Sequence, residues 1–288
     1  MLYAIGAAVF AALTTILAKI GLENVDSHFA TAIRTMVVLA FAWLMVFIVG
    51  AQGGIAEIRG RTWLYLVLSG LSAGGSWLCF FRALKLGNVS KVVPIDKSST
   101  IMTMILAFVF LSEPFSWVTV IGMVLMAIGT WLMLELKKEK TGSEVEKSSK
   151  SWLTFAILAA GFASLTAIFG RVGVADIDAN LWTAIRTIIV IPLSWLMVFI
   201  AGSQKTIKTV SGKSWLFLIL SGIATGASWL LFFNALQAGN ASHVVPIDKL
   251  SIVLTMAFAR LFLKERFSKR SIAGLVLLTT GTLLPIVF

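Results

Sequence analysis

Long apolar runs separated by short polar segments make up most of this chain. Ten of these runs contain enough residues to cross about 30 Å of hydrocarbon as α-helices, at about 1.5 Å per residue. The ten predicted spans are Leu2–Ile20, Ala30–Val49, Trp63–Leu84, Val89–Leu111, Trp117–Leu136, Trp152–Val172, Leu181–Ala201, Trp215–Leu236, Ala241–Leu263 and Ser271–Val287. The pattern therefore predicts an all-α integral membrane protein with ten transmembrane helices.

The spans fall into two copies of one five-span unit. Shifting the chain by 152 positions aligns Leu2–Leu136 with Thr154–Phe288 without a gap, and 65 of the 135 aligned pairs are identical. Such self-similarity indicates duplication and a common fold. Residues 1–136 are predicted to form the first repeat, residues 137–151 a polar, flexible cytoplasmic linker, and residues 152–288 the second repeat. Because each unit has an odd number of spans, the two repeats are expected to have inverted topology.

Composition supports the membrane class and excludes several others. Hydrophobic residues make up 58% of the chain and charged residues 13%, with a mean hydropathy of +0.95. Soluble domains are about a quarter charged. The net charge of +11 does not indicate a nucleic-acid partner, because the basic residues gather in the loops between apolar runs. The two histidines match no metal-ligand spacing, so we expect no metal and no cofactor.

Basic residues also indicate which side of the membrane each loop occupies. One side collects most of the lysines and arginines, and the other has little beyond Arg59, Arg61 and Arg171. By the positive-inside rule, the basic loops and the central linker are cytoplasmic and both termini lie outside. We expect a multi-pass protein of the cytoplasmic (inner) membrane. The first apolar run is too long for the apolar region of a cleavable signal peptide, so no such peptide is expected.

One polar stretch inside the apolar runs occurs twice. Val92–Lys97 and Val244–Lys249 both read Val-Val-Pro-Ile-Asp-Lys. A charge at bilayer depth costs on the order of 3 kcal/mol, and ionisable residues placed there are typically functional. Counting residues from the span ends places an arginine, a tryptophan and the Asp-Lys pair of each repeat at similar depth. The candidate substrate-binding or coupling residues are Asp96, Lys97, Asp248, Lys249, Arg34, Arg186, Trp77, Trp229, Ser76 and Ser228, and the candidate hinges are Pro94 and Pro246.

These candidates have structural alternatives. Asp96 and Asp248 either form buried ion pairs with Arg34 and Arg186 or titrate, which would couple transport to protons. The lysines either remain as cations that attract a carboxylate or phosphate, or extend to the membrane interface. The tryptophans either stack on a substrate ring or cation, or pack against other side chains. The prolines either bend a helix or lie harmlessly in its first turns.

A second set of motifs closes each repeat. The fourth span of each unit carries its proline, followed by Phe110–Ser116 in one copy and Phe262–Ser268 in the other, and then by a glycine-spaced last helix. With the two gap-free five-helix repeats, this pattern resembles the EamA type of the drug/metabolite transporter superfamily. The resemblance implies a secondary carrier that works by alternating access, often as an exporter of amino acids, other metabolites or drugs.

The function expected from these observations is secondary active transport. The chain has no phosphate-binding glycine loop, so the energy would come from a gradient, with protons as the candidate coupling ion. We expect a monomer that moves a small polar or amphipathic metabolite, with amino acids favoured, and that is not an enzyme. The alternatives are a passive channel or facilitator and a lipophilic drug exporter. The repeated Asp-Lys pair argues against a purely hydrophobic drug.

Overall fold

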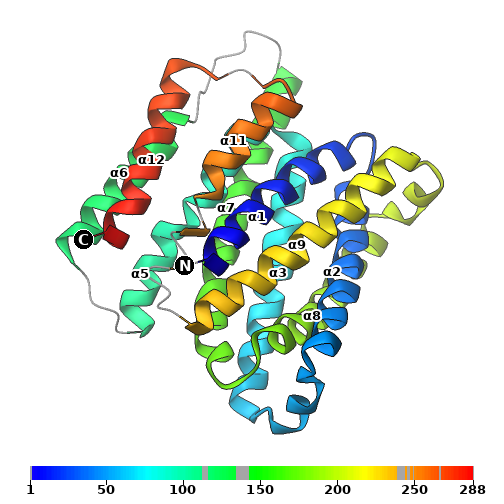
Figure 1. Ribbon diagram of the computed structural model, residues 1–288. Helices are drawn as coiled ribbons and strands as arrows, with labels where there is room; N and C mark the ends of the chain where they lie inside the picture. The colour runs from blue at the N-terminus through cyan, green and yellow to red at the C-terminus, as the bar shows by residue number, and fades with distance from the viewer. Residues whose placement is uncertain are drawn as a thin grey trace.

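The described part of the chain is helical (Figure 1). The computed structural model describes residues 2–111, 116–133, 143–238, 244, 247–248, 250–265 and 267–287, with the backbone alone at residues 90, 143–150 and 286–287. The α-helices are α1 Leu2–Gly21, α2 Ser27–Val49, α3 Gly60–Leu86, α4 Val89–Lys97, α5 Ser99–Leu111, α6 Trp117–Met133, α7 Ser143–Gly173, α8 Ala179–Ile200, α9 Gly212–Ala238, α11 Ser251–Phe262 and α12 Lys269–Val287. Short 3-10 helices lie at η1 Ala51–Glu57, η2 Val174–Asp176 and η3 Ser203–Lys208.

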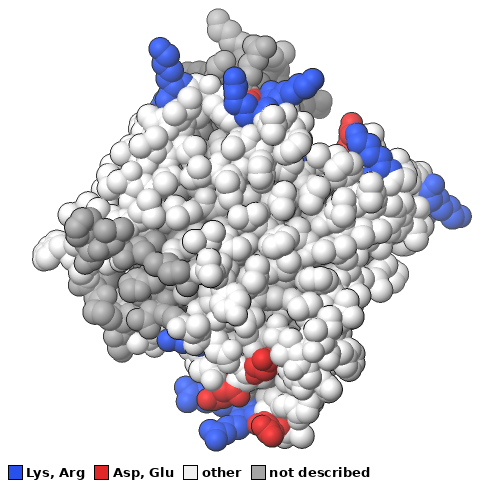
Figure 2. Space-filling model, in the orientation of Figure 1, with Lys and Arg blue, Asp and Glu red and all other residues white. Residues whose placement is uncertain are grey.

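Many of these helices are long and apolar enough to cross a membrane. Seven segments of the described chain meet that criterion, and α6 and α11 are shorter apolar helices. Lys and Arg side chains gather at the margins of the molecule, and the face between them carries almost no charge (Figure 2). An uncharged belt between charged ends is what a bilayer requires, because burying charges in hydrocarbon is costly. These features confirm a multi-span membrane protein.

The fourth predicted span is not one continuous helix. It is interrupted at Ser98, between α4 and α5. The hydroxyl of Ser98 donates to the carbonyl of Ile95 at 2.6 Å, and the hydroxyl of Thr100 donates to the carbonyl of Lys97 at 2.9 Å. The carbonyl of Ile95 also accepts the backbone N–H of Ser98 at 3.1 Å, so the two hydroxyls add side-chain bonds to carbonyls at the end of α4. Pro94 lies inside α4, so the interruption follows the proline rather than coinciding with it.

The predicted linker is partly helical. Helix α7 begins at Ser143 and runs without interruption into the sixth span. Residues 143–151 of the predicted linker therefore form the first turns of α7 and extend this helix beyond its apolar part. Residues 137–142 of that linker lie outside the described residues.

Equivalent aspartates begin α2 and α8. Asp26 Oδ1 accepts hydrogen bonds from the backbone N–H groups of His28 (2.9 Å) and Phe29 (3.3 Å), and Asp178 Oδ1 accepts the equivalent pair at 2.9 and 3.1 Å. Both helices therefore start slightly before the apolar run, since a capping carboxylate satisfies their first donors. Burial raises the pKa of Asp26, but the Ser203 hydroxyl and the two backbone N–H groups outweigh it, leaving that pKa below its usual value.

Helices of the two halves pack against one another in reciprocal pairs. Helix α1 lies against α9 and α3 against α7, while α2 packs on α8 and α6 on α12. The hydroxyl of Ser76 donates to the carbonyl of Ala159 at 3.0 Å, and the hydroxyl of Ser228 donates to the carbonyl of Ala7 at 2.9 Å. Both partners shift by 152 positions between these two bonds. The contact that α3 makes with α7 thus has its counterpart between α9 and α1.

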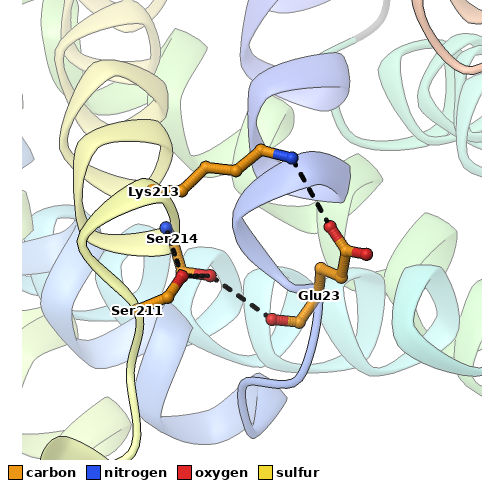
Figure 3. Close-up of polar contacts among 4 residues, drawn as sticks. All are labelled: Glu23, Ser211, Lys213 and Ser214. Carbon is orange, nitrogen blue, oxygen red and sulfur yellow. Dashed lines mark hydrogen bonds and ion pairs between the residues drawn. The ribbon is translucent and has the colours of Figure 1, made fainter.

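A polar contact joins the turn after α1 to the start of α9 (Figure 3). Lys213 Nζ lies 3.8 Å from Glu23 Oε2, with both side chains about two-thirds exposed (66% and 67%). The Ser214 hydroxyl donates to the carbonyl of Glu23 at 3.3 Å, and Ser211 accepts a bond from the backbone N–H of Ser214 at 3.1 Å. This is the one salt bridge between the side chains that the structure describes, and its exposure limits its contribution to stability.

Candidate functional site

A cavity of about 140 Å³ lies where helices of the two halves meet. Residues of α1, α3, α4, α5, α7 and α9 line it, together with Asp248. Each described lining residue except Phe81, Lys97 and Thr103 has a lining partner 152 positions away. The cavity is therefore built from matching positions of the two repeats.

Charged side chains from the repeated polar stretch reach this cavity. Asp96 and Lys97, both half-buried, line it from the end of α4, and Asp248, only 8% exposed, lines it from the second repeat. Asp96 and Lys97 directly precede Ser98, where α4 ends and α5 begins. Lys249 and Pro246, which were also predicted from the sequence, lie outside the described residues. Three of the predicted ionisable residues thus share one cavity.

The buried arginines do not form the ion pairs that were one alternative for the aspartates. Arg34 is 2% exposed, and it donates from Nε to Ser221 Oγ at 2.9 Å and from Nη2 to Thr225 Oγ1 at 2.6 Å. Its guanidinium also stacks on Phe81, 3.9 Å from the ring centroid. Helix α2 packs on α8 and α9, so Arg34 reaches hydroxyl groups on α9. The described side chains therefore include no ion pair between Arg34 and Asp96.

Arg186, the equivalent residue on α8, has a different environment. It is 1% exposed, and its guanidinium lies 4.1 Å from the ring centroid of Trp229 and 4.9 Å from that of Phe233. Its Nε and Nη1 are buried without a hydrogen-bond partner among the described residues. No ion pair between Arg186 and Asp248 is present among the described side chains. Cation–π contact is the main interaction that the structure gives this charge.

Aromatic rings form one wall of the cavity. The rings of Trp77 and Trp229 both line it and lie 6.2 Å apart at 52°. Trp229 also stacks on Phe233 at 5.3 Å and meets Phe232 edge-on at 5.7 Å. The two tryptophans therefore pack against other rings and face the cavity as well, and either role is compatible with their position.

The serines of the predicted site combine packing with exposure to the cavity. Ser76 and Ser228 line it while their hydroxyl hydrogens are directed to carbonyls of the neighbouring helix. A hydroxyl that donates still has lone pairs with which to accept. Each serine can therefore hold two helices together and accept a hydrogen bond from a ligand.

Several cavity residues were not anticipated from the sequence. Thr14, Thr166 and Thr225 bring hydroxyl groups from α1, α7 and α9, and Phe80 and Phe232 extend the aromatic wall. The signal that could have found the first two was available, since Thr14 and Thr166 are the same residue at the same repeat position inside apolar runs. Thr225 gave no such signal, because its repeat position holds an alanine.

Two lysines at helix ends bind backbone carbonyls, contacts that the sequence did not predict. Lys19 Nζ donates to the carbonyls of Leu84 (2.7 Å) and Gly87 (2.8 Å) at the end of α3, and Lys85 Nζ donates to the carbonyl of Val25 (2.8 Å) beyond α1. A cation at a helix C-terminus satisfies unpaired carbonyls and interacts favourably with the helix dipole. The two lysines fasten the ends of α1 and α3 to each other.

Comparisons with known proteins agree with this architecture. An uncharacterized transporter from Sinorhizobium sp. is 44% identical over 140 residues, which is 49% of this chain and 99% of that protein. An uncharacterized transporter from Archaeoglobus fulgidus is 24% identical over 99% of this chain and 96% of its own length. A crystal structure with 17% identity superposes with a TM-score of 0.74 over 98% of this chain and 96% of that one, which supports the fold.

A family model matches both halves of the chain. The model of the EamA-like transporter family matches residues 1–135 and again residues 150–287. The residues between the two matched segments, 136–149, nearly coincide with the predicted linker. This chain belongs to the EamA-like transporter family and is a membrane transporter of a small molecule, not an enzyme.

Proposed function

We propose that this protein is a secondary active transporter that moves a small polar or amphipathic metabolite, with amino acids favoured, across the cytoplasmic membrane by alternating access. The observation that carries the proposal is the cavity lined by matching positions of both repeats. Transporters built from inverted repeats bind their substrate between the repeats, near the middle of the membrane. A cavity with carboxylates, an ammonium group and tryptophans suits a small polar solute better than a lipid.

The proposed scaffold is two inverted five-helix repeats, residues 1–136 and 152–288, that rock against each other. The reciprocal hydrogen bonds of Ser76 and Ser228 support a two-fold relation between the halves. Inversion follows if each half has five spans, and the basic loops then face the cytoplasm with both termini outside. Two fused halves complete one cavity within a single chain, so the proposed transport unit is a monomer.

Two features are assigned roles in coupling and movement. Asp96 lines the cavity, and its carboxylate is the proposed group that binds a cationic group of the substrate or the coupling proton. Asp248 is its counterpart in the second half. The interruption at Ser98, four residues after Pro94, gives the short helix α4 a point about which to move relative to α5. Pro246 is proposed as the corresponding hinge.

Ligand-dependent stability of the purified protein in detergent tests the proposal. We would record the melting temperature of the wild type, Asp96→Asn and Lys97→Ala with amino acids, sugars, nucleotides, organic anions and lipophilic cations. A ligand that binds only the folded state raises that temperature. We expect a zwitterionic or anionic class to stabilise the wild type and to lose its effect with Lys97→Ala. Equal stabilisation of all three proteins would show that this cavity is not the substrate site.

A lipophilic drug exporter is the second candidate, and the aromatic wall of Trp77, Trp229, Phe80 and Phe232 favours it. Aromatic faces together with carboxylates attract lipophilic cations. Tetraphenylphosphonium in the same screen separates the two candidates. Stabilisation by this cation, lost in Asp96→Asn and unaccompanied by any effect of amino acids, would replace the first proposal with the second.

A further inference from the structure

The equivalent arginines Arg34 and Arg186 have different hydrogen-bond partners in the two repeats. In the first half, both donors on one edge of the Arg34 guanidinium are satisfied by hydroxyl groups of α9, Ser221 at 2.9 Å and Thr225 at 2.6 Å. Arg34 also contacts Phe81. A buried guanidinium with satisfied donors and a ring beneath it is a stable packing element, since buried charges need such partners.

In the second half the corresponding hydroxyl partners are missing or not bonded to Arg186 Nε in the described part of the chain. The position equivalent to Thr225 is Ala73, which has no hydroxyl. The position equivalent to Ser221 is Ser69. Its hydroxyl donates to the carbonyl of Thr166 at 3.4 Å, as Ser221 donates to the carbonyl of Thr14 at 2.8 Å, but no bond from Arg186 Nε to Ser69 is formed among the described residues. Arg186 Nε, the atom that corresponds to the Ser221 donor of Arg34, is buried without a partner in the described part of the chain, and so is Nη1. Leaving buried donors unsatisfied is costly, and such groups in a folded protein call for an explanation.

The difference lies at the wall of the central cavity. Thr225, the acceptor for Arg34, lines the cavity, and so does Ala73 at the matching place. The Arg186 guanidinium lies 4.1 Å from the centroid of Trp229, another lining residue, whereas Arg34 stacks on Phe81. Arg186 is not itself a lining residue, but the repeat relation places it beside the lining residues Ala73 and Trp229, where the described part of the chain supplies no acceptor.

We propose that Arg186 is an anion subsite of the central cavity that binds the carboxylate of the transported substrate beside Ala73 and Trp229, and that Arg34 is its structural counterpart. This inference rests on the transport function proposed above. A carboxylate oxygen would take the place that the Thr225 hydroxyl occupies in the first half. Arginine suits this role because its planar donors match a carboxylate and it remains charged when buried.

Charge in the cavity favours a zwitterion over a simple anion. Asp96 and Asp248 line the same space, so a substrate that places an anionic group at Arg186 would meet carboxylates and aromatic faces elsewhere. Both of those attract an ammonium group. The ligand class is therefore an α-amino acid or a similar solute with one carboxylate and one ammonium group, and inorganic phosphate would bind more weakly.

The test compares amino acids with their own carboxamides. L-leucine and L-phenylalanine would be titrated against L-leucinamide and L-phenylalaninamide, with inorganic phosphate as a third arm, and the melting temperature of the detergent-solubilised protein gives each dissociation constant. The carboxylate preference of the wild type is expected to be about 10-fold or more, as a charge-assisted pair provides.

Arg186→Gln should abolish this preference. Ala73→Thr should also abolish it while keeping the charge, because the new hydroxyl takes the arginine donor. Arg171→Gln, which removes a charge at the end of α7, should keep the wild-type preference.

The outcomes separate this inference from the proposed function. If the wild type binds acid and amide alike, and Asp96→Asn weakens both, the cavity is the transport site and the anion subsite is refuted. If Ala73→Thr and Arg186→Gln both keep the carboxylate preference, Arg186 is only a packing element. If neither amino acid nor amide binds and phosphate or tetraphenylphosphonium does, the ligand class is wrong.

Discussion

Placing a methyl group between α6 and α12 should destabilise the protein strongly. A Cβ at Gly129 would lie 2.5 Å from the backbone nitrogen of Leu278 and 2.6 Å from the carbonyl oxygen of Gly274. Ordinary van der Waals contacts of a Cβ begin at 3.4 Å, so the distance to the Leu278 nitrogen is 0.9 Å too short. The obstructing atoms belong to the backbone of α12, and only a separation of the two helices can relieve the clash.

The expected magnitude follows from two opposing effects. Overpacking of a well-packed contact costs about 1–3 kcal/mol, and replacing a helical glycine with alanine returns about 0.5–1 kcal/mol. Gly129→Ala should therefore lower the free energy of unfolding by about 1–2 kcal/mol. At about 2–4 °C per kcal/mol, the melting temperature should fall by several degrees. Gly274→Ala should behave in the same way, because its added Cβ would lie 2.6 Å from the carbonyl oxygen of Gly129.

Gly161→Ala is the matched control, because its added Cβ meets only the Met102 side chain, at 3.9 Å. This substitution also lies inside a helix, α7, and should leave the melting temperature unchanged or raise it slightly. Unfolding can be followed by intrinsic fluorescence, since the chain has 10 tryptophans. An unchanged melting temperature for Gly129→Ala, or an equal loss for Gly161→Ala, would refute the close approach of α6 and α12.

Helix caps, an exposed salt bridge and a partly buried lysine give further predictions. Asp26→Ala and Asp178→Ala should each cost about 1 kcal/mol in the free energy of unfolding, because each removes a helix cap. The contribution of Asp26 should be present above about pH 4 and disappear as the pH falls through its lowered pKa, so thermal melts from pH 7 to pH 3 should show a smaller pH dependence in Asp26→Asn. Glu23→Ala should change stability by less than about 0.5 kcal/mol, because the contact with Lys213 is exposed, and a chemical-denaturation midpoint close to the wild-type value checks this. Lys19→Met should cost about 1–3 kcal/mol by leaving two carbonyls at the end of α3 unpaired, measured as a fall in melting temperature.

The architecture was largely predictable because two strong signals agree. Hydropathy locates apolar helices, and the repeat predicts matching contacts such as those of Ser76 and Ser228. The interruption at Ser98 was not predictable, since it depends on side-chain hydroxyls that satisfy carbonyls within an otherwise apolar run. The start of α7 at Ser143 was missed for the opposite reason, because hydropathy does not register a helix formed by polar residues.

The sequence predicted which residues line the cavity better than it predicted which side chains contact one another. Counting residues gave the depth of Asp96, Trp77 and Trp229, and all three line the cavity. It did not give the direction in which a side chain points, which changes by about 100° with each residue of a helix. Arg34 therefore has the depth to approach Asp96, yet it binds hydroxyl groups of α9.

Uptake of labelled amino acids into proteoliposomes tests the central claim most directly. Purified wild type, Asp96→Asn and Asp248→Asn would be reconstituted with and without an imposed proton gradient. The account predicts uphill accumulation by the wild type under the gradient, its loss in both variants, and no accumulation when the gradient is collapsed. Flux that never exceeds equilibration and is the same in all three proteins would contradict gradient-coupled transport through this cavity.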